Sequence, residues 1–191
     1  VSNARLSRSL SVLMASLWLA ACSPGDAPRT TVAAPVAFQS GDECHVCGMV
    51  IGEFPGPKGQ VLETHSGAVR KFCSTRDLLT WWLQPEHKAL QAQLYVHDMG
   101  QSTWATPEDG HLVDARTALY VIGSDAQGAM GPTLASFAQR AAADAFAASR
   151  GGQVYTFDQL DLPTLQQVGD APHAHHAHPA PQGEAAAHHG H

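Results

Sequence analysis

The chain has 191 residues, a formal net charge of −6 and a hydrophobic fraction of 44 %, and it contains four cysteines. This length accommodates one domain with a substantial apolar core. The acidic balance, without a patch of basic residues interleaved with aromatic ones, excludes a typical nucleic-acid-binding protein. No Ser/His/Asp arrangement or carboxylate pair stands at a recognisable motif, so we expect a protein that is not an enzyme.

The first 21 residues have the pattern of a secretory signal peptide. A short basic region precedes an apolar run at 10–21, which is too short to be a comfortable membrane span. The run ends in "LAAC" at 19–22, which resembles a bacterial lipobox, so we expect Cys22 to be acylated and to hold the chain on the periplasmic side of a membrane. Ser23 favours the outer membrane over the inner one. Removal of the signal takes away two arginines and no acids, which changes the net charge from −6 to about −8.

Two low-complexity segments flank the expected domain. Residues 22–40 include the Pro/Ala/Thr-rich stretch "SPGDAPRTTVAAPVA" and predict a flexible tether. Residues 169–191 predict a disordered tail, which is either an incidental extension or a segment that gathers Cu(II), Ni(II) or Zn(II) loosely. The histidines that would bind these ions are His173, His175, His176, His178, His188, His189 and His191.

Between these segments, residues 41–168 show alternating strand-like and helix-like patterns. The run "STRDLLTWWLQ" at 74–84 predicts a helix, because its apolar residues recur at helical spacing and Ser74 can serve as its N-cap. The alanine-rich segment 134–152 predicts a second helix that ends at glycines, and 158–167 predicts a short third helix. Strand-like runs bounded by turn residues occupy 48–51, 59–65, 68–72, 92–99, 117–124 and 153–157.

This order of elements favours an α+β fold with mainly antiparallel strands. A faint internal echo relates "GAVRKFCSTRDLL" to "GQVYTFDQLDLP", which share a glycine, alternating apolar residues, a phenylalanine and a helix start. We therefore expect two small ββα-type lobes, at about 41–105 and 106–168. The apolar run 117–124 is continuous enough to be a central strand.

The segment "CHVCGM" at 44–49 carries the most distinctive chemistry. If Cys22 is acylated, Cys44, Cys47 and Cys73 remain, and an odd number in an oxidising compartment leaves one thiol free, intermolecular or metal-bound. Covalent haem needs C-x-x-C-H, whereas a glycine follows the second cysteine here. A thioredoxin-like motif should open a helix, whereas a strand-like run and a Pro/Gly turn follow here.

The donor types favour a soft metal ion. "CHVCGM" followed by "FCSTRD" resembles compact metal-binding modules with C-x-x-C-G and F-C-S-x-x-C, but Asp77 stands where their last cysteine would be. This departure weakens a tetrahedral zinc site, which needs four ligands. Cu(I) fits better, because it takes thiolate and thioether ligands at low coordination number. In a strand, Cys47 and Met49 would share one face.

Further candidate ligands lie outside this segment. Met130 stands between glycine-rich turns in "AQGAMGP", where packing gives little reason for a methionine, so we favour it as a ligand. Met99 ends a strand beside His97, which would share its face, and core packing of the methionine is an equal alternative. Cys73 is as consistent with a small buried side chain as with a ligand.

Several segments, in order along the chain, resemble the NosL copper-chaperone lipoproteins of nitrous oxide reductase maturation. They are "CGM", "FPGPKGQV", "LYVHDM", "VDARTALYVIGS", "GAMGP" and "AFAASRGGQV", and they span about Cys44 to Phe157. The resemblance implies a periplasmic, membrane-anchored Cu(I) carrier with two ββα-type lobes, which supplies nitrous oxide reductase and works with an ABC-type membrane complex. It maps the metal-relevant residues onto Cys47, Met49 and Met130, treats the other cysteines as additional, and leaves open whether an ion bridges a homodimer.

Three other functions fit parts of the sequence. A periplasmic thiol-disulfide oxidoreductase would use Cys44 and Cys47. A thiol-dependent lyase acting on organometal compounds would use Cys47, Cys73 and Asp77. A lipoprotein with a structural disulfide would bind metals only through its histidine-rich tail.

Overall fold

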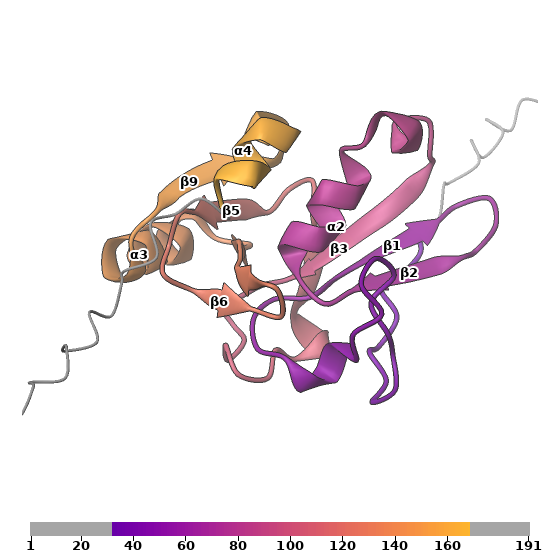
Figure 1. The fold of residues 1–191 in the computed structure, drawn as a ribbon, viewed down its shortest axis with the longest axis horizontal. Helices are drawn as coiled ribbons and strands as arrows, with labels where there is room; N and C mark the ends of the chain where they lie inside the picture. The colour runs from indigo at the N-terminus through magenta and orange to yellow at the C-terminus, as the bar shows by residue number, and fades with distance from the viewer. Residues whose placement is uncertain (1–31, 169–191) are drawn as a thin grey trace, which may run out of the picture. The chain divides into compact units, whose positions relative to one another are not determined.

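Two antiparallel sheets organise the residues that the computed structural model describes, which are 32–168 (Figure 1). The predicted signal peptide, the lipidation site Cys22 and the histidine-rich tail lie outside the described residues. No helix of the described part has the length and apolar character needed to cross a membrane.

The first sheet has the strand order β2-β1-β3-β4 and is covered by helix α2. Ser74 caps this helix, because its hydroxyl accepts a hydrogen bond from the Asp77 N–H, as the sequence predicts. Leu78 and Leu79 point into the core with no exposed surface. The elements are β1 (Gly59–Glu63), β2 (Val69–Phe72), α2 (Thr75–Trp82), β3 (Ala92–His97) and β4 (Leu112–Asp114).

The second sheet has the order β8-β5-β9, with the predicted central strand in its middle, and helix α3 packs against it. A small hairpin of β6 and β7 leaves this lobe between β5 and β8 (Figure 1). The elements are β5 (Leu119–Ile122), β6 (Gln127–Gly128), β7 (Gly131–Pro132), β8 (Ala135–Phe137), α3 (Arg140–Arg150), β9 (Gln153–Thr156) and α4 (Leu162–Gln167). Single 3-10 turns occupy Ile51–Glu53, Pro85–His87, Asp109–His111 and Phe157–Gln159.

Three boundaries differ from the sequence-based expectation. The helix predicted to start at 134 begins at Arg140, because the three residues of β8 are buried and pair with β5. The predicted strand at 48–51 is only a single bridge between Glu43 and Val50 followed by a 3-10 turn. The first sheet also continues past the predicted lobe boundary near 105, because β4 pairs with β3.

The predicted tether is shorter than 22–40, because the chain is held against the fold before it reaches Ser40. The buried Gln60 side chain binds both the N–H and the C=O of Val36, each at 2.9 Å. The Phe38 N–H donates to the Asp109 carboxylate at 2.8 Å. A flexible segment cannot keep such contacts, so the prediction of a tether was wrong for this part of the chain.

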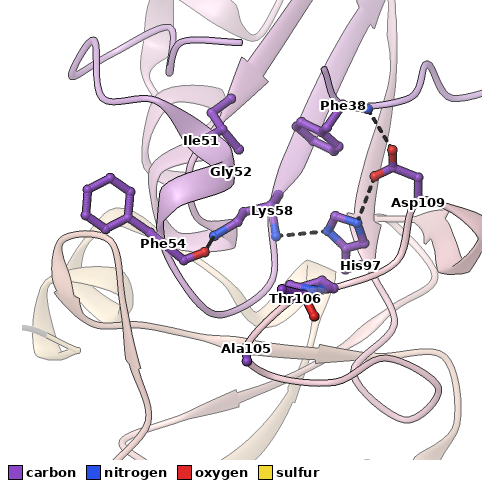
Figure 2. A pocket seen from close by; sticks show the side chains of 10 residues that line it. Phe38, Ile51, Gly52, Phe54, Lys58, His97, Ala105, Thr106 and Asp109 are labelled. Carbon is purple, nitrogen blue, oxygen red and sulfur yellow. Dashed lines mark hydrogen bonds and ion pairs between the residues drawn. The ribbon is translucent and has the colours of Figure 1, made fainter. Parts of the chain in front are cut away.

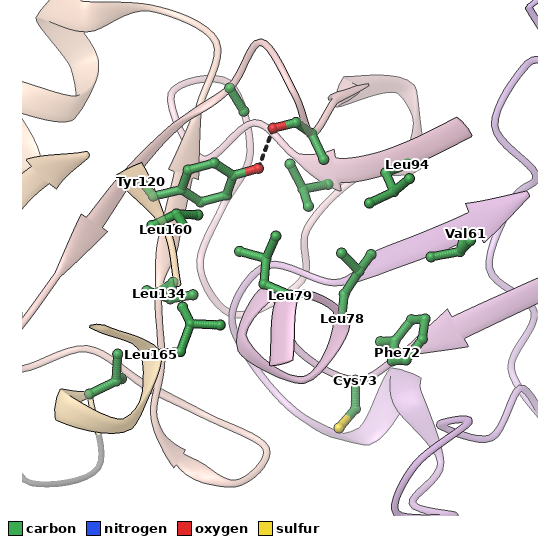
Figure 3. Packing of buried hydrophobic residues seen from close by; sticks show 14 of the residues in the cluster. Val61, Phe72, Cys73, Leu78, Leu79, Leu94, Tyr120, Leu134, Leu160 and Leu165 are labelled. Carbon is green, nitrogen blue, oxygen red and sulfur yellow. Dashed lines mark hydrogen bonds between the residues drawn. The ribbon is translucent and has the colours of Figure 1, made fainter. Parts of the chain in front are cut away.

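One apolar core joins the two sheets through α2 and α4 (Figure 3). Phe72 and Leu78 from the first lobe belong to the same cluster as Tyr120 and Leu165 from the second. Cys73 lies at the margin of this cluster and has no exposed surface. A cysteine at the junction of a buried strand and a capped helix is therefore held rigidly, which is what a metal ligand requires.

Candidate metal centre

Three cysteine side chains converge next to the start of α2. The sulfur atoms of Cys44, Cys47 and Cys73 all lie within 4.8 Å of one another. None of the three forms a disulfide, and the Cys47 and Cys73 sulfurs are 3.6 Å apart. Cys44 and Cys73 are buried, whereas Cys47 is exposed, so the cluster opens to solvent on the Cys47 side.

A tight turn presents the first two cysteines. The Cys44 N–H donates to the Met49 carbonyl and the Gly48 N–H donates to the Cys44 carbonyl, both at 2.9 Å. Gly48 has a φ of 72°, a backbone conformation that favours glycine and that directs the chain back after Cys47. The His45 N–H donates to the carbonyl of Lys71 in β2 at 2.8 Å, which fixes the turn to the strand that leads to the third cysteine.

Asp77 adds a carboxylate beside the third cysteine. Its Oδ2 accepts hydrogen bonds from the Cys73 thiol at 3.1 Å and from the Ser74 hydroxyl at 2.8 Å. The Ser74 hydroxyl in turn caps α2. The sequence analysis singled out Asp77 as a departure from a four-cysteine pattern and as the acid of a lyase, and the structure places its carboxylate against Cys73, outside the group formed by the three sulfurs.

The thiols do not ionise alike. Interaction with the neighbouring Cys73 side chain lowers the pKa of Cys44 to about 5, although burial opposes this effect. The same interaction with Cys44, together with burial and the neighbouring Asp77, raises the pKa of Cys73. Burial raises the pKa of Cys47. One thiolate at Cys44 is therefore ready for a cation at neutral pH, with two protonated thiols beside it.

This donor set fits a soft, monovalent metal. Cu(I) accepts two or three thiolates without needing a fourth ligand. A tetrahedral Zn(II) site needs four ligands, whereas only the three sulfurs of this cluster lie within 4.8 Å of one another. The exposed position of Cys47 distinguishes the cluster from a closed structural site, because an incoming ligand could reach a metal ion from that side.

Comparisons with known proteins agree with this chemistry. The NosL family model matches residues 35–164. The chain is 53 % identical over 157 residues to the copper-binding lipoprotein NosL of Stutzerimonas stutzeri, and the match covers 82 % of each chain. The chain belongs to the NosL family.

Further NosL relatives support the family and the fold. The copper-binding lipoprotein NosL of Achromobacter cycloclastes is 39 % identical over 136 residues, which cover 68 % of this chain and 70 % of the relative. The crystal structure of the copper chaperone NosL from Shewanella denitrificans matches with a TM-score of 0.65 at 46 % identity, over 68 % of this chain and 97 % of that one. The predicted NosL family and α+β fold are thereby confirmed.

The two methionines predicted as ligands from the NosL pattern lie near the surface. Met49 is half-buried at the end of the C-x-x-C-G turn. Met130 is 52 % exposed in the turn between β6 and β7. The base of this hairpin contacts the first turn of α2, where the Arg76 guanidinium lies 3.4 Å from the Pro132 carbonyl. The hairpin therefore touches the helix that follows Cys73, and ligation by Met49 and Met130 stays a prediction.

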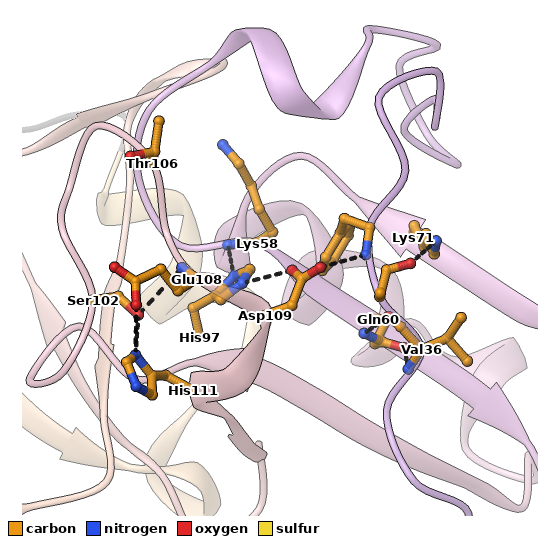
Figure 4. A network of polar contacts seen from close by, with 12 residues as sticks. Val36, Lys58, Gln60, Lys71, His97, Ser102, Thr106, Glu108, Asp109 and His111 are labelled. Atoms are coloured by element: carbon orange, nitrogen blue, oxygen red, sulfur yellow. Dashed lines mark hydrogen bonds and ion pairs between the residues drawn. The ribbon is translucent and has the colours of Figure 1, made fainter.

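The structure does not bring the other two candidates to the cluster. Met99 is 9 % exposed and packs in a separate apolar group with Phe137, so core packing explains it. His97 lies in a polar network in which its Nδ1 accepts the Lys58 N–H at 3.1 Å (Figure 4). An Nδ1 that accepts this bond leaves the proton of the neutral ring on Nε2, so neither nitrogen has a free lone pair for a metal.

Lys58 is a buried charged residue whose ammonium has no carboxylate partner in the described part of the chain. Its side chain is 4 % exposed, and its ammonium donates to the carbonyls of Phe54 at 2.6 Å and Pro55 at 3.0 Å. It forms no ion pair with any carboxylate in residues 32–168. Burial lowers the pKa of Lys58 to about 8, with Cys73 a smaller opposing influence.

This shift predicts a pH-dependent stability. Between the folded pKa of about 8 and the unfolded value of 10.5, the unfolded chain binds more protons, so raising the pH favours folding. We expect the unfolding free energy of the native chain, relative to that of Lys58→Met, to rise by about 2 kcal/mol from pH 8 to about pH 10. Urea unfolding of both proteins across this range, in carboxylate-free buffer, measures the difference. Parallel curves would contradict a buried ammonium.

Proposed function

We propose that the chain is a non-enzymatic Cu(I) metallochaperone, lipid-anchored on the periplasmic side of a membrane, that delivers copper for assembly of the copper centre of nitrous oxide reductase. The observation that carries the proposal is the convergence of three free thiols, of which only Cys47 is exposed. Copper binding and a lipoprotein nature, named for two relatives, support it.

The asymmetry of the cluster gives a route for transfer. Cys44 and Cys73 are buried and held by the turn and by α2, so they retain the ion. Cys47 stands at the surface, where a donor or acceptor thiolate can approach the ion and exchange ligands one at a time. Thioethers from Met49 and Met130 would add neutral ligands that leave easily, which keeps binding tight enough to prevent loss and loose enough to permit release.

Membrane attachment would serve delivery. Acylation of Cys22 would confine the carrier to a membrane surface and raise its effective concentration near a membrane-bound partner. Ser23 weakly favours the outer membrane for this attachment. The expected partners are nitrous oxide reductase and the ABC-type membrane complex of its maturation. A metal-bridged homodimer is compatible with a cluster that is open on one side.

An anaerobic competition titration against a colorimetric Cu(I) chelator tests the proposal. We would compare the reduced full chain in detergent with a version that ends at Asp170 and lacks only the histidine-rich tail. Tight binding near one copper per chain, or one per two chains, in both proteins supports the chaperone. Loss of binding with the tail would assign metal capture to the histidines. No competition by either protein would contradict a Cu(I) carrier, and turnover of a test disulfide would then favour the oxidoreductase.

Met130 gives a second, finer test. Replacing it with leucine keeps the size of the side chain but removes the sulfur, so we expect Cu(I) affinity to fall about tenfold, the lower end for loss of a supporting group at a metal site. Met99→Leu is the matched control and should leave the affinity unchanged, because Met99 packs in the other apolar group. The same chelator competition measures both, and an unchanged Met130→Leu affinity would remove this residue from the site.

A further inference from the structure

A second candidate site lies in a cavity on the face formed by the end of β3 and the loop before Asp109. The cavity has a volume of about 120 Å³, and both Lys58 and His97 line it (Figure 2). Its remaining walls are largely apolar and include Phe38 and Phe54. A space of this size holds a few water molecules or one small organic ion.

Lys58 brings an uncompensated positive charge to this cavity. Its two hydrogen bonds go to neutral carbonyl groups, and an ammonium has three N–H donors, so one donor is left over. No carboxylate of residues 32–168 pairs with it. A nearly fully buried cation without a counter-ion is unfavourable, and an anion in the adjoining cavity would offset that loss.

His97 supplies a second unsatisfied donor. It is 1 % exposed, and its Nδ1 accepts the Lys58 N–H, so its proton is on Nε2. Nε2 lies 3.4 Å from the Asp109 Oδ1, yet it forms no hydrogen bond. The Phe38 ring stacks on the imidazole at 5.5 Å between centroids and holds its plane. Lys58 and His97, which line the same small cavity, therefore each retain one unsatisfied donor.

Asp109 restricts which anion can enter. Asp109 also lines the cavity, and its Oδ2 accepts a hydrogen bond from the Phe38 N–H at 2.8 Å (Figure 2). This fixed negative charge opposes a dianion such as sulfate or hydrogen phosphate much more than a monoanion. The apolar walls suit a short alkyl group rather than a fully polar ion.

We propose that this cavity is a binding site for a small monocarboxylate, whose carboxylate oxygens accept hydrogen bonds from the Lys58 ammonium and the His97 Nε2–H. The site is separate from the cysteine cluster and does not depend on copper. For a ligand of so few atoms, we expect a dissociation constant of roughly a millimolar.

Acetate is the probe for the test. The full chain in detergent is titrated with ¹³C-labelled acetate, while sodium chloride keeps the ionic strength constant, and the carboxylate resonance of acetate is followed by NMR. We expect saturable broadening or shift with a roughly millimolar midpoint. Ala105→Phe, an exposed substitution at the mouth of the cavity, should weaken binding at least about tenfold by filling the space. Ser66→Phe, on the turn between β1 and β2, is the matched control and should bind acetate like the native chain.

Lys58→Met separates charge from shape and should also remove acetate binding. If this variant fails to fold, the Ala105→Phe comparison still decides, because that residue is at the surface. The proposal is overturned if acetate gives no saturable signal, if Ala105→Phe binds it as tightly as the native chain, or if phosphate binds equally well. Cu(I) affinity should be the same in Ala105→Phe and the native chain, which keeps this result independent of the proposed copper function.

Discussion

Replacing Cys47 with serine should weaken Cu(I) binding by at least about a hundredfold, because a hard, protonated hydroxyl takes the place of a soft thiolate. Cys47 is the one exposed member of the cluster, and its sulfur is 3.6 Å from that of Cys73. The substitution leaves two buried sulfurs and changes the volume little. Chelator competition with the reduced protein measures the loss, and the unfolding midpoint of the metal-free protein should change little.

The adjacent Val46 provides the matched control. It is 48 % exposed on the same turn and carries no donor atom, so Val46→Ala should retain the native affinity. If Cys47→Ser also retains it, the metal does not bind at the cluster. If both variants lose affinity equally, the turn itself is damaged and the assignment of Cys47 as a ligand fails. The thiol-disulfide oxidoreductase makes a different prediction, because loss of Cys47 would then abolish disulfide exchange without involving copper.

The sequence could predict the chemistry of the site better than its geometry. Local spacing predicted metal binding by "CHVCGM" and a helix cap at Ser74, because both depend on contacts within a few residues, and the structure confirms the cap. The convergence of Cys44 and Cys73 depends on docking of the turn onto β2, a contact that no spacing rule contains. The spacing to Met49 and the resemblance to NosL proteins therefore favoured Cys47, and only the fold made Cys73 its neighbour.

The expectations for β8, His97 and Met99 differ from the structure for one physical reason, which is contact with residues distant in sequence. Residues of β8 read as the start of an alanine-rich helix, but burial against β5 decides their conformation, since tertiary context overrides propensity. His97 and Met99 looked like neighbours on one strand face and so like ligands. In the structure, His97 accepts a hydrogen bond from the Lys58 N–H, and Met99 packs in the apolar group around Phe137. Both contacts involve residues that are distant in sequence.

Phe72→Ala should lower the free energy of unfolding by about 3–5 kcal/mol, the range for truncating a buried phenylalanine. The side chain has no exposed surface and ends β2 immediately before Cys73. Its ring lies 5.6 Å from that of Trp81 on α2 and 5.8 Å from that of His45 on the C-x-x-C-G turn. One residue therefore supports the strand, the helix and the turn that together position the three sulfurs.

Phe72 should therefore couple the stability of the fold to metal binding. Val69→Ala, in the same strand β2, is the control variant. Val69→Ala removes an apolar side chain that is 39 % exposed, so the unfolding free energy should change by no more than about 0.5 kcal/mol. Urea unfolding measures both variants, and Cu(I) competition below the unfolding transition measures their sites. We expect Phe72→Ala to bind Cu(I) more weakly even while folded, because the His45 turn loses its contact. Native affinity in a folded but destabilised Phe72→Ala would instead mean that the backbone bond from His45 to Lys71 positions the turn without the ring.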